Sequence, residues 1–205
     1  MKYDPGQMIS TDVYKLMIRS IIPRPIAWIS TVSPDGTRNI APFSFFTGIT
    51  VDPPTVCFVP ARKTGGARKD TLANVEATGE FVVNIVTEEL AVAMNDTATE
   101  YPADVDEFER AGLSPVDSDV VAPPRIGESP VNMECRLDKI VEVGGKGGVL
   151  VIGEVVMFHV DERVLAEGKV DPALLKAVGR LGGMEYSRTT DTFALDRKKF
   201  RDDAD

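Results

Sequence analysis

Histidine and cysteine are scarce in this 205-residue sequence, and their scarcity excludes several kinds of active site. The one histidine is His159, and the two cysteines, Cys57 and Cys135, lie far apart in apolar segments without a CxxC motif. A structural zinc site needs about four nitrogen or sulfur ligands at short spacings, so we expect no metal site. We expect all three side chains to be packed in strands, and we assign no catalytic side chain.

Long apolar runs are also missing. The segment Gly148–Val160 is broken by Glu154 and falls well short of the roughly 20 apolar residues that a membrane-spanning helix needs. Residues Met1–Ser10 lack the apolar core of a secretion signal. The sequence therefore predicts a cytoplasmic protein with no membrane partner.

Nucleotide-binding fingerprints and nucleophile elbows are absent as well. The GGKGG segment at Gly144–Gly148 lacks the spacing of a phosphate-binding loop and lies between two predicted strands, so it predicts a hairpin turn. No GxGxxG motif follows a strand, and no GxSxG motif occurs. The acidic residues Glu88, Glu89, Asp106 and Glu107 lie in polar contexts, and we expect them to be solvated surface carboxylates.

Positive charge is in short supply overall but is concentrated in one place. The net charge is −9, yet the first 75 residues carry +4 and the rest carry −13. Four basic residues fall within eight positions: Arg62, Lys63, Arg68 and Lys69. A basic loop in an acidic chain is suited to a local anion, although a solvated loop is the simpler alternative. The acidic total predicts no nucleic-acid partner.

Turn residues and β-branched runs predict strands that follow one another along the chain. Ile26–Val32 and Thr37–Ala41 flank the turn sequence SPDG, which is typical of a β-hairpin. Further strands are expected at Phe43–Val51, Thr55–Val59, Glu80–Val86, Asn132–Val143 and Gly148–Val160, and helices at Ser10–Ile22, Asp70–Gly79, Glu88–Asn95 and Pro172–Val178. Because helices and strands do not alternate regularly, we predict a mainly β protein, an antiparallel barrel with peripheral helices.

The organisation along the chain is simple. No change of composition marks a domain boundary, so we expect one domain over residues 1–195 and a charged, frayed tail over residues 196–205. The segment Tyr101–Ser129 is rich in proline and aspartate and predicts an irregular excursion over the surface. Its DEFERAG sequence at residues 106–112 is suited to one or two helical turns.

The start of the predicted helix at Asp70–Gly79 is a candidate phosphate site. Lys69 supplies a charge, Thr71 supplies a hydroxyl group, and the helix N-terminus supplies free backbone N–H groups. A capped surface helix, with Asp70 or Thr71 as the N-cap, is the alternative. The sequence alone leaves both interpretations open.

The segment Asn39–Thr47 is a candidate site for a flat heteroaromatic ring. Phenylalanines alternate with small hydroxyl residues after Pro42, so the chain offers apolar faces beside short hydrogen-bonding groups. Taken alone, Phe43, Phe45 and Phe46 are more typical of a hydrophobic core than of a cofactor site, and so is Trp28.

Four longer blocks occur in a fixed order along most of the chain, between about residues 18 and 188. They read PRPIAWISTVSPDGTRNIAPFSFFTGITVDPPTVCFV, ARKDTLANVEATGEFVVNI, PPRIGESPVNMEC and VGRLGGMEYSR. In this order and spacing they resemble the flavin reductase-like family of FMN-binding split barrels. The resemblance implies a split antiparallel β-barrel and a homodimer that holds FMN near the subunit interface.

The resemblance also implies the residues that bind the cofactor. They are Ser44, Phe45, Phe46 and Thr47 for the ring and ribityl chain, Pro60, Ala61 and Arg62 beside the ribityl and phosphate groups, Lys69, Asp70, Thr71 and Asn74 for the phosphate, and Arg180 and Tyr186 near the flavin. Some family members carry a histidine where this sequence has Arg180, so a histidine-assisted hydride step is not expected here.

The activity that the resemblance implies is that of an NAD(P)H-dependent flavin reductase, an oxidoreductase. Hydride would pass from NADH or NADPH to N5 of bound FMN, and electrons would pass on to a monooxygenase, another acceptor protein or oxygen. The alternative is a flavoredoxin-like electron carrier or flavin-binding protein without its own nicotinamide site.

Overall fold

The computed structural model describes residues 1–60, 63, 65–144 and 148–198. Within them, the largest element is a seven-stranded antiparallel sheet with the strand order β2-β1-β5-β8-β9-β4-β3. Its strands are β1 (Ala27–Val32), β2 (Arg38–Phe43), β3 (Phe46–Val51), β4 (Pro54–Phe58), β5 (Glu80–Ile85), β8 (Val131–Val143) and β9 (Gly148–Val160).

The sheet curls into a split barrel. Strands β2 and β3 are its two edges, yet β2 ends at Phe43 and β3 begins at Phe46. Three consecutive Cα–Cα steps of about 3.8 Å span at most about 11 Å, so the two edges must approach each other at this end. The predicted mainly β, split antiparallel barrel is confirmed.

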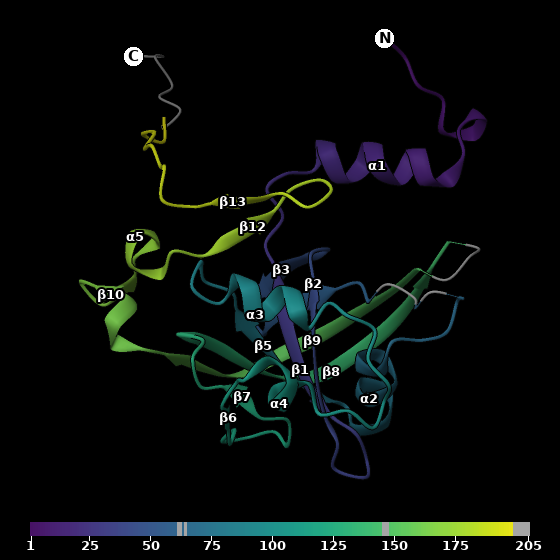
Figure 1. Ribbon diagram of the computed structural model, residues 1–205. Helices are drawn as coiled ribbons and strands as arrows, with labels where there is room; N and C mark the ends of the chain where they lie inside the picture. The colour runs from purple at the N-terminus through teal and green to yellow at the C-terminus, as the bar shows by residue number, and fades with distance from the viewer. Residues whose placement is uncertain (61–62, 64, 145–147, 199–205) are drawn as a thin grey trace.

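Helices and short hairpins surround the barrel. The α-helices are α1 (Ser10–Ser20), α2 (Asp70–Thr78), α3 (Ala91–Asp96), α4 (Glu107–Ala111) and α5 (Pro172–Leu175), and the 3₁₀ helices are η1 (Pro5–Gln7) and η2 (Glu162–Val164). The short strands are β6 (Pro115–Val116), β7 (Arg125–Ile126), β10 (Leu165–Ala166), β11 (Lys169–Val170), β12 (Val178–Arg180) and β13 (Tyr186–Arg188). Figure 1 shows α1 and the β12–β13 hairpin on the same side of the barrel, away from α2 and α4. In the described residues no helix is long and apolar enough to cross a membrane.

Aromatic side chains fill the barrel interior. The Phe58 ring lies 5.3 Å from the rings of both Phe43 and Phe81, measured between centroids. Gly153 of β9 faces Phe81, and a Cβ at this position would lie 2.5 Å from the Phe81 ring. A second cluster, with Trp28 and Phe108 fully buried, packs α3 and α4 against the outside of the sheet.

Several helix boundaries differ from those that the sequence predicts. The N-cap of α2 is Lys69 rather than Asp70 or Thr71, and no side chain caps it, whereas Gly79 ends the helix in the left-handed region as expected. Helix α3 begins at Ala91 because residues 87–90 form a turn. Helix α5 ends at Leu175 because Val178 pairs with Arg188 in the β12–β13 hairpin.

The predicted hairpin turn and the predicted C-terminal tail each lie partly outside the described residues. Residues 145–147 of the predicted hairpin turn lie outside them, although β8 and β9 pair antiparallel up to Val143 and Gly148, on either side of that turn. Residues 199–205 of the predicted tail also lie outside them. The division into a domain over residues 1–195 and a tail stays a prediction.

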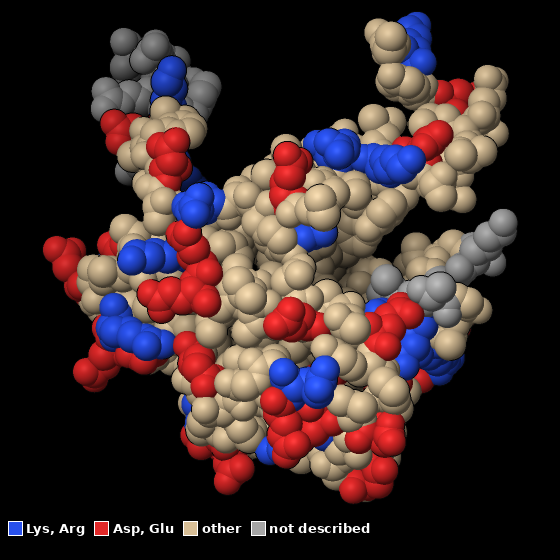
Figure 2. Space-filling view, in the orientation of Figure 1, with Lys and Arg blue, Asp and Glu red and all other residues tan. Residues whose placement is uncertain are grey.

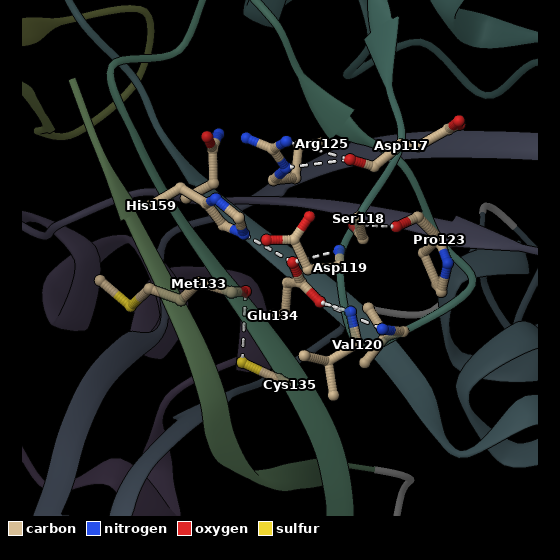
Figure 3. A network of polar contacts seen from close by, with 12 residues as sticks. Asp117, Ser118, Asp119, Val120, Pro123, Arg125, Met133, Glu134, Cys135 and His159 are labelled. Carbon is tan, nitrogen blue, oxygen red and sulfur yellow. Dashed lines mark hydrogen bonds and ion pairs between the residues drawn. The ribbon is translucent and has the colours of Figure 1, made fainter.

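The 101–129 excursion is tied to the sheet by one buried carboxylate (Figure 3). Glu134 of β8 has no exposed surface, and its oxygens accept hydrogen bonds from the backbone N–H groups of Asp119, Val120 and Val121 at 2.7–3.0 Å. His159 of β9 lies 2.6 Å from the same carboxylate. Burial raises the pKa of Glu134, but the four hydrogen bonds outweigh it and hold the pKa below its ordinary value.

Candidate functional site

A cavity opens between the start of α2 and the second half of β2, and we call it the α2 pocket. Its walls come from β2, α2, the segment between α3 and α4, and the first residue of α4. The residues that line it include Asn39, Pro42, Phe43, Lys63, Lys69, Asp70, Thr71, Glu100, Tyr101 and Glu107. Three of the predicted phosphate ligands, Lys69, Asp70 and Thr71, therefore line a common cavity.

The lysines of the α2 pocket lie beside carboxylates. Lys63 Nζ is 2.6 Å from Asp70 Oδ2, and Lys69 Nζ is 3.4 Å from Glu100 Oε1. Figure 2 shows basic and acidic side chains interspersed over the face of the molecule that it draws. An anion that enters the pocket has to compete with these carboxylates for the lysines.

The first turn of α2 offers neutral hydrogen-bond donors to the same pocket. No side chain caps the helix, so its first backbone N–H groups have no side-chain acceptor at the N-cap. Backbone N–H groups at a helix N-terminus favour anions. Thr71 is 1% exposed, and its hydroxyl group lies 3.5 Å from Asn39 Oδ1. The set of donors around the pocket is therefore suited to a phosphate group.

Glu107, at the start of α4, is a buried carboxyl group in this pocket. It is 6% exposed, and its Oε2 atom accepts hydrogen bonds from Asn39 Nδ2 at 2.6 Å and from the Ile40 N–H at 2.5 Å. Burial raises the pKa of Glu107 to about 7, although these two hydrogen bonds lower it; nearby Asp70 raises it and Lys69 lowers it. The expectation that Glu107 is a solvated surface residue was wrong.

A second cavity lies at the closure of the barrel, and we call it the Tyr186 pocket. It is lined by Ile26, Pro42, Phe43, Ser44, Met94, Arg180 and Tyr186. The Arg180 guanidinium lies over the Tyr186 ring, 4.4 Å from its centroid. Three predicted ring-binding residues, Ser44, Arg180 and Tyr186, are thus brought together although more than 130 positions separate Ser44 from Arg180.

Pro42 and Phe43 line both cavities. The α2 pocket and the Tyr186 pocket are therefore neighbours along the end of β2. The first is lined by lysines, a hydroxyl group and a helix N-terminus, and the second by aromatic, apolar and short polar side chains. An elongated ligand with an anionic end and a flat end fits such a pair of pockets.

Arg24 is linked to the Tyr186 pocket through its hydrogen bond to Ser44. It is 4% exposed, and it donates hydrogen bonds to the carbonyl oxygens of Ile18, Ile21 and Leu181 and, at 3.3 Å from Nε, to Ser44 Oγ. Its guanidinium also lies 5.9 Å from the centroid of the Phe45 ring. Burial lowers the pKa of Arg24. One side chain thereby fixes α1, the β2–β3 connection and the β12–β13 hairpin together.

The other predicted site residues have different surroundings. Phe46 packs against the barrel core, and the exposed Thr47 lies on β3. Asn74 donates a hydrogen bond to Thr31 Oγ1 at 3.0 Å and lines a neighbouring cavity. Pro60 is buried beyond the end of β4. The predicted residues Ala61 and Arg62 lie outside the described residues.

Glu107 and Arg24 are the residues that sequence reasoning missed at this site. Arg24 stands in the PRPIAW block, but nothing in its neighbours signals a buried guanidinium. Glu107 stands in an acidic run, and its burial depends on Asn39 and Ile40, which lie far away in the sequence.

The cysteines and the histidine lie away from both pockets. Cys135 is buried and Cys57 is half-buried, and burial raises the pKa of both thiols, so neither is poised as a nucleophile. Ligand atoms of His159, Glu134 and Asp119 come within 4.8 Å of one another. Both Glu134 oxygens already accept hydrogen bonds, so this group serves to hold the excursion on the sheet.

Comparisons with known proteins identify the family and agree with the fold. A family model described as a flavin reductase like domain matches residues 18–182. An uncharacterised protein of Halalkalibacterium halodurans is 39% identical over 201 residues, which are 96% of each chain. Nitrilotriacetate monooxygenase component B from Bacillus cereus is similar in structure, with a TM-score of 0.91, 37% identity and 95% and 98% of the two chains covered. For 2-nitrobenzoate 2-nitroreductase from Pseudomonas fluorescens the TM-score is 0.87, with 31% identity and both chains fully covered. This chain belongs to the flavin reductase-like family.

Proposed function

We propose that this chain binds FMN and acts as an NAD(P)H-dependent flavin reductase in the cytoplasm. The observation that carries the proposal is the pair of neighbouring pockets joined by Pro42 and Phe43. The α2 pocket would hold the phosphate group through Lys69, Thr71 and the first N–H groups of α2. The Tyr186 pocket would hold the ring system beside Ser44.

The types of side chain that line the two pockets suit the phosphate and the ring of FMN. A phosphate needs charged and backbone donors, which the α2 pocket supplies, and a flat ring needs an apolar surface with a few polar edges, which Pro42, Phe43 and Ser44 supply. When bound, FMN supplies the redox chemistry by accepting a hydride equivalent from the nicotinamide. The protein orients the ring and limits access to it, and no side chain of this chain needs to act as a base.

The nicotinamide nucleotide would dock on the exposed face of the flavin ring. The sequence has no glycine fingerprint for its pyrophosphate, so shape and a few charges must hold it, and binding should be weak and exchangeable. Arg180 is the cationic side chain of the Tyr186 pocket and is placed to attract an anionic nucleotide.

We further propose that the electrons pass to a separate acceptor protein. The similarity to nitrilotriacetate monooxygenase component B, whose name makes it one component of a monooxygenase system, supports an oxygenase component as the acceptor. The similarity to a 2-nitrobenzoate 2-nitroreductase supports direct reduction of a small aromatic compound as another use of the same electrons.

We also propose that the chain works as a homodimer with the flavin near the interface. Helix α1 has no buried residue, although Leu16, Met17 and Ile21 are apolar and 42–53% exposed. A second copy that covers this helix would bury these side chains close to the Tyr186 pocket, since Arg24 links α1 to that pocket. Light scattering of the purified protein measures this directly, and a monomeric mass would overturn it.

One experiment tests the reductase proposal. The purified protein is loaded with FMN, freed of excess ligand and examined for a flavin absorbance band, and NADH or NADPH is then added without oxygen. We expect the flavin band to bleach with at least one nucleotide. Bound FMN that neither nucleotide bleaches would overturn the reductase and leave the electron carrier, and a protein that never retains or binds FMN would overturn both.

A further inference from the structure

The described lining of the α2 pocket carries more acidic than basic side chains. Among its described lining residues, two lysines, Lys63 and Lys69, face three carboxyl groups, Asp70, Glu100 and Glu107. Asp70 and Glu100 lie within ion-pair distance of the lysines, whereas the hydrogen bonds to Glu107 come from the neutral groups of Asn39 and Ile40. A phosphate dianion next to an ionised Glu107 would meet like charge in a partly buried cavity.

The hydrogen bonds of Glu107 fix the roles of its two oxygens. Oε2 accepts from both Asn39 Nδ2 and the Ile40 N–H, so it is the natural carbonyl oxygen of a neutral carboxyl group. Oε1 accepts no hydrogen bond within the part of the chain that the structure describes. Glu107 lines both the α2 pocket and the neighbouring cavity that Asn74 lines. A proton on Oε1 would turn this atom from an acceptor into an O–H donor on a residue of the pocket wall.

We infer that Glu107 takes up one proton from solvent when a phosphate group enters the α2 pocket, and that its O–H group then donates to the phosphate. The inference rests on the proposed FMN site and identifies the residue that sets how tightly the phosphate end is held. The protein would release FMN more readily as the pH rises. Such a site suits a flavin that is exchanged with a partner.

Other charged groups surround Glu107 on every element packed against it. Glu109 on its own helix α4 and Asp106 at the N-cap of that helix are engaged by Arg38 of β2, at 3.6 and 2.5 Å. Asp35, in the turn between β1 and β2, lines a neighbouring cavity together with Glu107. The start of α2 contributes Lys69 and Asp70, and the residues on either side of the pocket contribute Lys63, Glu100 and Tyr101. Asp70 raises and Lys69 lowers the pKa of Glu107, and burial, the largest influence, brings it to about 7.

The test compares FMN affinity between pH 7 and 8.5, where the phosphate itself is almost fully ionised. The full-length chain is titrated with FMN and with riboflavin, and flavin fluorescence reports binding. We expect FMN affinity to fall by about tenfold per pH unit at the alkaline end, and riboflavin affinity to stay constant. The variant Glu107→Gln places an N–H donor where the O–H would be, so it should bind FMN independently of pH.

The matched control is Glu109→Gln, which removes a carboxylate two positions along the same helix whose side chain is 78% exposed. This variant should keep the pH dependence of the parent protein. Calorimetry in buffers of different ionisation enthalpy should show close to one proton taken up per FMN at pH 8, and none for Glu107→Gln. Retained FMN binding without a pH slope, or a slope that survives in Glu107→Gln, would overturn the inference alone. Failure of the parent protein to bind FMN at any pH would overturn the proposed site together with it.

Discussion

The buried carboxylate of Glu134 offers a stringent test of how the barrel holds its long excursion. Oε1 accepts from the Asp119 N–H and contacts His159, and Oε2 accepts from the N–H groups of Val120 and Val121. In Glu134→Gln one oxygen becomes an NH₂ group. In place of Oε2 this group leaves the N–H groups of Val120 and Val121 without an acceptor; in place of Oε1 it leaves the Asp119 N–H without one, while His159 Nε2 can accept from it. One or two donors therefore lose their acceptor, and each costs about 1–3 kcal/mol where it is buried, so we expect a loss of roughly 1–6 kcal/mol in the free energy of unfolding.

Urea unfolding at pH 7 measures this loss. The fully buried Trp28, which is the one tryptophan of the sequence, supplies the fluorescence signal. The control is Glu128→Gln in the same excursion, whose carboxylate accepts from the Ser114 N–H at an exposed position and should cost well under 1 kcal/mol. A Glu134→Gln protein no less stable than Glu128→Gln would refute the assignment of Glu134 as the anchor.

The difference between the parent protein and Glu134→Gln should also depend on pH. The pKa of Glu134 in the folded protein lies below its ordinary value of 4.5, so the ionised form stabilises the fold. This contribution is fully present above about pH 4.5 and is lost as the pH falls through the folded-state pKa. The gap between the two unfolding curves should therefore narrow in acid, and a constant gap would contradict the hydrogen-bonding scheme.

Three further substitutions test other parts of the structure. Lys69→Ala should weaken FMN binding by about 1–3 kcal/mol and leave riboflavin binding unchanged, as flavin fluorescence titrations will report, because it removes a charge-assisted contact to phosphate; equal losses for both would mean that Lys69 supports the fold. In the parent protein the unfolding free energy should decline by up to about 3 kcal/mol between pH 4.5 and 7, because the fold prefers the neutral form of Glu107. Glu107→Gln should abolish this decline, and parallel curves of unfolding free energy against pH for the two proteins would contradict the reasoning. Gly153→Ala should lower the unfolding free energy by roughly 1–3 kcal/mol, because the new methyl group would lie 2.5 Å from the Phe81 ring, and an unchanged urea midpoint would show that the ring moves aside freely.

Local signals in the sequence predict the elements that depend on near neighbours. The SPDG turn predicts the β1–β2 hairpin, and Gly79 predicts the end of α2. The predicted end of α5 at Val178 was wrong, because Val178 belongs to strand β12 and pairs with Arg188 of strand β13. Pairing partners at such separations leave no trace in a local pattern.

The candidate site shows the same division. Lys69 and Thr71, the proposed phosphate donors, lie two positions apart in the sequence, and the structure places both at one pocket. Glu107 was misjudged because an acidic run reads as surface until the burial of Phe108 and the hydrogen bonds from Asn39 and Ile40 are known. Similarly, periodicity could not separate Phe46, in the core, from Phe45, beside Arg24.

The strand order has a consequence for how the chain matures. Hairpin β3–β4 joins the sheet through β9, and hairpin β1–β2 joins it through β5, so the barrel closes only when the β8–β9 pair is in place. A nascent chain that ends before Gly148 carries Ser44, Lys69 and Thr71 but has no β9 on which β4 can pair. The Tyr186 pocket also needs Arg180 and Tyr186, which are synthesised after all the strands of the large sheet. A ligand that spans both pockets therefore cannot be a template for early folding of this chain, since much of the fold depends on contacts between residues far apart in the sequence.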